Sequence, residues 1–296
     1  MSTALLLIPD FSLILIGFIL LRITKWGDSF WIGLEKMVYY VMFPALLFLS
    51  TSRTPINLAA TGKMLQIAVA VCLIGILLGW LAKPVFKVGP KIFESGVQTA
   101  WRFNSYIGLA LAYRLLGDEG TSLMALILGL AVPICNAAAV HALAYGQGGL
   151  VKELAKNPML IATICGVAFN LLGFSMPDVV NVLLSRLGNA SIALGLLLVG
   201  AGLRLSGLQQ GKALSAYFLA VKLLALPAAA LVMGRTLELP PQQMQIIMIF
   251  AALPTASSAY VLTTRMGGNG PMVAFIISAS TVLCAFTLPL WLAIAG

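Results

Sequence analysis

The stretch LPTASSAY (Leu253–Tyr260) places a proline, a threonine and two serines inside a long apolar segment that otherwise has the composition of a buried helix. A proline within a helix removes one backbone donor and clashes with the carbonyl group four residues earlier. Water can satisfy the backbone groups that such a break exposes in a soluble protein, but in lipid each unsatisfied group is costly. The meaning of this stretch therefore depends on whether the chain lies in a membrane.

The composition of the whole chain is that of a polytopic membrane protein. Of its 296 residues, 60% are hydrophobic and 9% are charged, whereas soluble domains average about 25% charged residues. The charges cluster between apolar runs of about 18 to 24 residues, which is the length that spans a bilayer as a helix. We predict an all-α fold with ten transmembrane helices, at approximately residues 4–21, 31–51, 64–82, 94–114, 122–146, 159–175, 179–203, 213–236, 244–265 and 271–294.

The distribution of lysine and arginine predicts the orientation. The odd-numbered connections hold ten of these residues and the even-numbered ones hold four. Cytoplasmic loops carry the excess of positive charge, so both termini are expected outside the cytoplasm of a cell membrane, with the loop around Lys152 and Lys156 inside. The same bias and contact with anionic lipids explain the net charge of +9, and we expect no nucleic-acid partner.

The spacing of the spans predicts an internal repeat. A shift of 150 residues lays the first five spans (1–150) onto the last five (151–296), and it places Pro254 over Asn104. Because five is odd, the second copy enters the membrane from the opposite side, an arrangement typical of secondary transporters. Matched breaks in the fourth and ninth spans indicate a substrate site, and free helix N-termini there would favour an anion. The alternative is an ordinary kink whose hydroxyl groups bond back to their own helix.

The candidate site residues are the polar side chains at or near these breaks. As substrate-binding residues we select Asn104, Ser105, Pro254, Thr255, Ser257, Asn136 and Gln98. Arg102 and Lys222 are buried cations by position, which are functional by default. Arg102 could attract a carboxylate or reach the membrane interface along its own stem. Lys222 could pair with a carboxylate or with carbonyl groups of another helix.

Three further features have mainly structural interpretations. His141, the only histidine, is either a hydrogen-bonded structural residue or a proton relay. Gly75 and Gly79 form a GxxxG pair that predicts close helix packing. The four cysteines lie inside apolar runs without metal-ligand spacing, so we expect them to be packing residues and predict no metal site and no cofactor.

Three stretches together resemble the auxin efflux carrier family of bacterial permeases and plant PIN proteins. They are YVMFPALLFLS (Tyr40–Ser50), WRFNSYIGLALAYRLLG (Trp101–Gly117) and AALPTASSAYVLTTRMGG (Ala251–Gly268). The resemblance covers essentially the whole chain. It departs from the family pattern at Ala110, where the family has a proline, and this leaves Asn104 and Gly108 to hold the fourth span open.

The resemblance implies that helices 4 and 9 cross at their breaks, as in the related bile-acid symporter-like fold. It also implies an elevator-type movement of a transport domain (spans 3–5 and 8–10) against a scaffold (spans 1, 2, 6 and 7). The implied substrate is a small organic anion, such as malate, malonate or an auxin-like acid. The coupling ion, proton or sodium, is left open, and so is a homodimer.

Competing functions lack the residues they need. An intramembrane enzyme requires a nucleophile–base pair or a metal set, and the sequence has neither HExxH nor GxSxG. A channel usually shows a repeated filter or a charged ring, and a sensor needs an output domain. No phosphate-binding GxxxxGK[ST] loop is present for ATP-driven transport. We therefore expect a secondary transporter, with a channel or sensor as the alternative.

Overall fold

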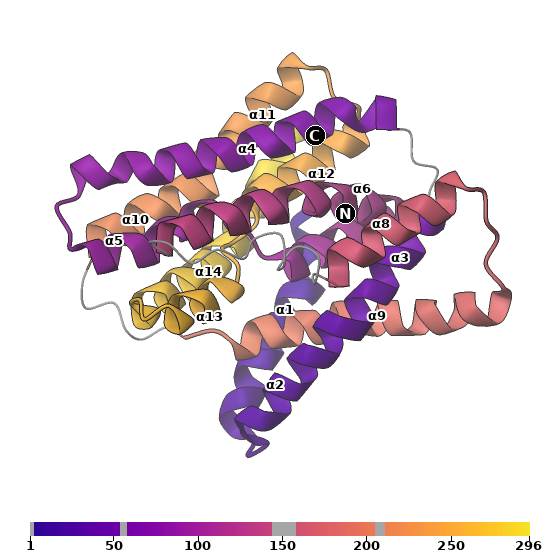
Figure 1. The fold of residues 1–296 in the computed structure, drawn as a ribbon, viewed down its shortest axis with the longest axis horizontal. Coiled ribbons are helices and arrows are strands. Elements are labelled where there is room, and N and C mark those ends of the chain that lie inside the picture. Colours follow the sequence, from indigo (N-terminus) through magenta and orange to yellow (C-terminus); the bar gives the residue numbers. More distant parts are fainter. Residues whose placement is uncertain (1–2, 54–57, 144–157, 205–210) are drawn as a thin grey trace. The chain divides into compact units, whose positions relative to one another are not determined.

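The computed structural model describes residues 3–53, 58–143, 158–204 and 211–296, and within these ranges the chain is helical without any strand (Figure 1). This agrees with the all-α prediction. In chain order the elements are α1 (Thr3–Ile23), α2 (Gly27–Met37), η1 (Val38–Met42), α3 (Phe43–Arg53), α4 (Leu58–Val85), α5 (Pro90–Val97), η2 (Gln98–Ala100), α6 (Ser105–Leu143), α8 (Pro158–Leu171), α9 (Asp178–Ala201), α10 (Lys212–Ala220), η3 (Val221–Ala225), α11 (Leu226–Thr236), α12 (Pro241–Ala252), α13 (Ser258–Arg265) and α14 (Gly270–Ala295).

Among the described residues, six helical stretches are long and apolar enough to cross a membrane. The chain is therefore a multi-pass membrane protein. The count of six differs from ten partly because two expected spans, 94–114 and 122–146, fall in the single stretch Pro90–Leu143. The expected span 244–265 is divided into the short helices α12 and α13. Ten spans in two inverted repeats remain a prediction, and Lys152 and Lys156 lie outside the described residues.

The chain forms two compact units. The first draws on Met1–Gly62, Tyr106–Gly129 and Val151–Gly202, and the second on Lys63–Ser105, Leu130–Leu150 and Leu203–Gly296. Helix α6 contributes to both.

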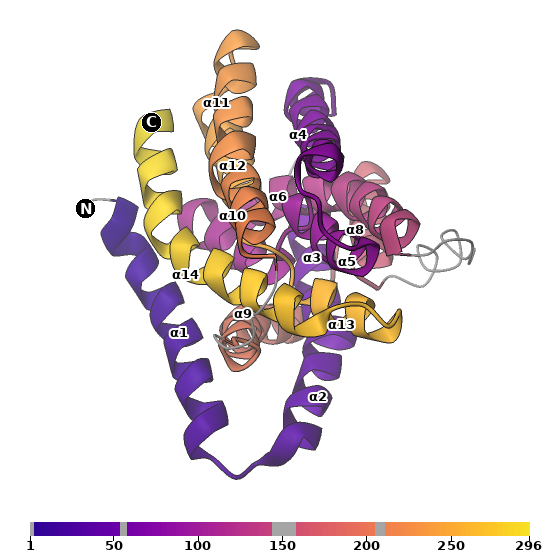
Figure 2. The ribbon, with the colours of Figure 1, turned by 90° about the vertical axis from the view of Figure 1, so that its left-hand side faces the viewer.

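In the first unit, glycines let helix backbones approach closely. Helix α9 packs against α1 and α3, and α3 packs against α8. A Cβ added at Gly200 would clash with Ile14 O, and one added at Gly17 would clash with Leu197 O. Small residues of this kind are what allows close packing of transmembrane helices, where hydrophobic burial gives little driving force. Figure 2 shows α1 and α2 diverging from their shared turn.

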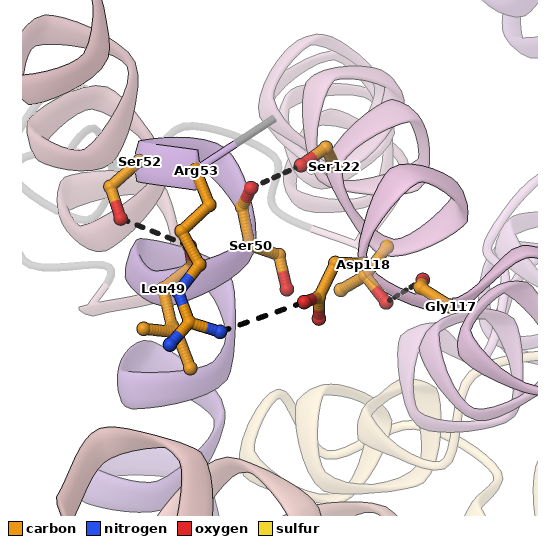
Figure 3. A network of polar contacts seen from close by, with 8 residues as sticks. Leu49, Ser50, Ser52, Arg53, Gly117, Asp118 and Ser122 are labelled. Atoms are coloured by element: carbon orange, nitrogen blue, oxygen red, sulfur yellow. Dashed lines mark hydrogen bonds and ion pairs between the residues drawn. The ribbon is translucent and has the colours of Figure 1, made fainter. Parts of the chain in front are cut away.

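The first unit also contains the bend of α6. Gly117 has φ 57° and ψ −139°, a conformation that glycine adopts without a Cβ clash. The helix therefore bends within the LGDEG connection, Leu116–Gly120. Next to it, Arg53 forms a 3.7 Å ion pair with Asp118, and Ser122 Oγ donates to Ser50 O at 2.6 Å (Figure 3). These contacts join the end of α3 to the bend.

Asp10 is a buried acidic residue whose setting the sequence did not reveal. Its side chain lies in α1, and its residue exposure is 7%. The Arg114 guanidinium lies 3.8 Å from Asp10 Oδ2. A carboxylate is tolerated at such a position because a cation compensates its charge.

Two π-helical turns precede prolines. The turn η1 comes before Pro44, and η3 comes before Pro227. Pro227 has no N–H to donate to the carbonyl of Leu223, four residues earlier. The indole Nε1 of Trp291 donates to this carbonyl instead, at 2.9 Å. Both proline positions are visible in the sequence, but the wider helical turns are not.

Helix α12 is the core of the second unit. Its residues from Ile246 to Ala252 are at most 1% exposed, so this part of the helix is enclosed on all sides, unlike a helix on a protein surface. It packs against α11, α14 and η3. Helix α14 also contacts α5, α10 and α13 (Figure 1). The ninth expected span is therefore held from several directions where it breaks.

Candidate functional site

The fourth expected span is interrupted in the second unit. Helix α5 continues into η2, which ends at Ala100, and α6 begins at Ser105. Between them, Arg102, Phe103 and Asn104 are not helical. The span is thus broken although Ala110 replaces the family's proline. Gly108 lies inside α6, so the expectation that it holds the break open is wrong.

Trp101 anchors this break. Its indole Nε1 donates to Cys135 O at 3.1 Å, which ties the end of η2 to the second half of α6. A Cβ added at Gly75 or Gly79 would lie 3.0 Å from atoms of Trp101. The GxxxG pair of α4 thus makes room for the indole ring, which confirms its assignment as a packing motif.

The ninth expected span is interrupted in the same unit. Helix α12 ends at Ala252 and α13 begins at Ser258. Leu253 is extended, with ψ 145°, as is common before proline. Phe250 O cannot receive a hydrogen bond from Pro254 and accepts one from Leu253 N at 3.4 Å. The chain leaves the helical conformation for several residues, which excludes an ordinary kink.

The two breaks meet. Asn104 N donates to Pro254 O at 2.9 Å, and Thr255 Oγ1 donates to Thr99 O at 3.0 Å. Each break therefore supplies hydrogen bonds to the other, in a place where water is scarce and unsatisfied backbone is costly. The residue exposures of Asn104 and Thr255 are 3% and 0%. Pro254 and Asn104, which the 150-residue shift aligns, are in direct contact.

Arg102 connects side chains around the crossing. Its guanidinium donates to Gln98 Oε1 at 3.0 Å, to Asn136 Oδ1 at 3.1 Å and to Ser258 Oγ at 2.9 Å. Gln98 Nε2 in turn donates to Thr263 Oγ1 at 2.9 Å. Arg102 is 8% exposed, so of its two interpretations the structure does not support extension to the membrane interface.

Lys222 approaches the crossing from η3. Its Nζ lies 3.5 Å from Ala251 O, in the last turn of α12. In the part of the chain that the structure describes, no carboxylate lies within ion-pair distance of Lys222. Of the two interpretations of this residue, the structure supports pairing with carbonyl groups of another helix.

The remaining candidates lie near the crossing or away from it. Ser105 and Ser257 are half-buried at the starts of α6 and α13. His141 is exposed near the end of α6, with its ring centroid 6.4 Å from that of Trp80. None of the described hydrogen bonds of the crossing involves it. The structure thus brings together the predicted residues Gln98, Arg102, Asn104, Asn136, Lys222, Pro254 and Thr255.

Sequence reasoning missed several partners of these residues. Ser280 Oγ accepts a hydrogen bond from Thr255 N at 3.1 Å, and the Cys284 thiol donates to Ala252 O at 3.5 Å. Both lie on α14, where small polar residues in an apolar helix are too common to be a signal. Ser258 lies within LPTASSAY and could have been selected with its neighbours.

The electrostatic character of the site is positive. Among the described residues of the second unit, the buried charged residues are Arg102 and Lys222. Buried cations without a buried carboxylate nearby favour an anionic ligand. No group of three or more His, Cys, Asp or Glu side chains converges within the described ranges. A surface hollow of this unit, lined by Gly234, Arg235 and Glu238 among others, contains none of the crossing residues.

The second half of the chain matches a known protein family. A family model described as "Membrane transport protein" matches residues 148–292. The second half of the chain is thus similar to membrane transport proteins of this family. The family includes the PIN-like auxin efflux carriers, which agrees with the resemblance, and its match contains the third quoted stretch, Ala251–Gly268.

Several relatives are similar to this chain over nearly its whole length. A relative from Rhizobium meliloti (strain 1021), named "Putative malonate transporter", is 27% identical over 96% of this chain and 92% of its own length. An "Uncharacterized transporter" of Methanothermobacter thermautotrophicus is 25% identical over 94% of each chain. The "Uncharacterized transporter YfdV" of Escherichia coli (strain K12) is 22% identical over 97% of this chain and 95% of its own. The family and these relatives are transporters and not enzymes.

Proposed function

We propose that the protein is a secondary carrier for a small organic anion, bound where the two interrupted helices cross. The observation that supports this most directly is the hydrogen bond of 2.9 Å between Asn104 N and Pro254 O, with Arg102 and Lys222 buried around it. Broken helices that meet inside a membrane protein are where secondary carriers bind substrates. The buried positive charge selects an anion.

The substrate class is a carboxylate, such as malate, malonate or an auxin-like acid. The name of the Rhizobium relative supports a dicarboxylate. A carboxylate can accept hydrogen bonds from the Asn104 amide, and the Arg102 guanidinium offers donors in a planar fork that matches carboxylate geometry. In the structure the Thr255 hydroxyl donates to Thr99 O, so a substrate would compete with that bond.

The transport cycle we propose is of the elevator type. The two compact units support it, because both breaks belong to the second unit. That unit would supply most of the transport domain of spans 3–5 and 8–10, although Tyr106–Gly129, from spans 4 and 5, belongs to the first unit. Spans 1, 2, 6 and 7 would form the scaffold. The proposal includes ten spans in two inverted repeats and both termini outside the cytoplasm of the cell membrane.

Uptake by purified protein in proteoliposomes tests this function. A panel of labelled mono- and dicarboxylates is offered with an imposed proton gradient, an imposed sodium gradient or neither. We expect accumulation of at least one carboxylate above that in protein-free vesicles, and an excess of unlabelled substrate should abolish it. Failure of every carboxylate under all three conditions would contradict the proposal.

A further inference from the structure

Lys222 is a buried cation that substrate binding alone does not explain. It is 1% exposed and lies within the π-helical turn η3. Single π-helical turns are rare and occur frequently at functional sites. Here Pro227 and the bond from Trp291 Nε1 to Leu223 O maintain the departure from regular helix. The position of Lys222 is therefore fixed by two residues that lie outside the crossing.

The ammonium group is next to the carbonyl end of a broken helix. The last carbonyl groups of a helix have no partner within it and carry partial negative charge. Helix α12 ends at Ala252, and Pro254 prevents its continuation. Lys222 Nζ lies 3.5 Å from Ala251 O, and the Cys284 thiol donates to Ala252 O, also at 3.5 Å. The end of α12 is thus covered by one cation and one weak donor.

In the part of the chain that the structure describes, no carboxylate forms an ion pair with Lys222. The carbonyl groups at the end of α12 therefore compensate its charge. Both described ion pairs, Arg53–Asp118 and Arg114–Asp10, belong to the first unit. An ammonium group buried without a compensating partner is strongly unfavourable because it has lost its hydration. The negative end of α12 is the compensation that the structure offers.

We propose that Lys222 is the resident cation of the crossing and makes transport independent of sodium. In secondary carriers, unwound carbonyl groups and half-helix C-termini are the positions that coordinate coupling sodium ions. In this protein a side chain provides the positive charge at that position. The sodium-independence of transport rests on the proposed carrier function. The role of Lys222 at the end of α12 does not depend on the substrate.

Thermal unfolding of the purified protein tests the charge itself. The variants are Lys222→Met, which keeps the length and removes the charge, and Lys222→Arg, which keeps the charge. Lys87→Met is the matched control, since Lys87 is exposed. We expect Lys222→Met to lower the melting temperature by several degrees, with a smaller change for Lys222→Arg and none for the control. A higher melting temperature for Lys222→Met would overturn the proposal, because it would show that the buried charge was only a cost.

Wild-type protein provides a second test that needs no variant. We expect the same melting temperature in sodium chloride and in choline chloride at equal ionic strength. A rise in sodium would show that a sodium ion, and not Lys222, completes the site, and it would overturn the proposal even if Lys222→Met fails to fold.

Uptake separates this proposal from the carrier function. Carboxylate uptake at the same rate in sodium-free and sodium-containing buffer supports both, whereas uptake that requires sodium refutes the resident cation and leaves the carrier intact. If no carboxylate is taken up at all, the carrier function fails, and the two melting experiments still decide the role of Lys222.

Discussion

At the scale of single residues, the backbone of Asn104 has a structural role and its side-chain amide has a proposed binding role. Its backbone N–H holds the crossing through Pro254 O, and alanine keeps that bond while removing the amide. A hydrogen bond to a charged group contributes about 1.5 to 3 kcal/mol. Asn104→Ala should therefore raise the dissociation constant for the carboxylate roughly tenfold to a hundredfold, measured by calorimetry. The exposed Asn189 of α9 provides the control Asn189→Ala, and equal affinity in both variants would exclude the Asn104 amide from the site.

Arg102 is the second residue whose side chain gives a prediction. Its one guanidinium donates hydrogen bonds to Gln98, Asn136 and Ser258. A lysine keeps the charge but lacks the planar fork that reaches three acceptors. We expect Arg102→Lys to bind substrate more weakly than wild type, and Arg102→Met to bind more weakly still. Titration of both variants at equal folded fraction measures this. If Arg102→Met retains wild-type affinity, the residue serves only the architecture.

At the scale of elements, Pro254 keeps α12 from continuing. Pro254→Ala restores an N–H that can bond to Phe250 O, so α12 can extend and draw Pro254 O away from Asn104. We expect a lower transport rate together with weaker binding, measured in vesicles and by calorimetry. Pro241→Ala is the matched control, since Pro241 lies in the first turn of the same helix, where proline is well tolerated. Similar losses in both variants would indicate a general effect on α12.

The packing of α4 against Trp101 gives a second prediction at this scale. A Cβ added at Gly75 already lies 3.0 Å from Trp101 and 3.3 Å from Leu226, so Gly75→Leu would push against both, whereas a Cβ added at Gly62 in the same helix meets nothing within 4 Å. Overpacking typically costs about 1 to 3 kcal/mol. We expect a lower melting temperature for Gly75→Leu and little change for Gly62→Leu. Equal melting temperatures would mean that α4 does not support the break.

At the scale of the whole molecule, the positive-inside bias makes a prediction about orientation. Lys87 and Thr236 are exposed residues of the described chain. Lys87 follows the third expected span, and Thr236 is the last residue of the eighth. In a background without the native cysteines, a cysteine at position 236 should react with an impermeant maleimide added outside intact cells, and one at position 87 should react only after permeabilisation. The reverse pattern would invert the proposed topology.

Composition and spacing by themselves determined that this chain is a helical, multi-pass membrane protein, because apolar runs of bilayer length have no other stable state. They also determined where two helices would break, since Pro254 cannot donate a backbone hydrogen bond and the 150-residue shift pairs it with Asn104. Only the tertiary structure decided which groups meet there. Arg102 could have extended to the interface and Lys222 could have paired with a carboxylate, because long side chains reach several environments from one backbone position. Their hydrogen-bond partners lie up to 156 residues away in sequence, and such partners are fixed only when helices pack.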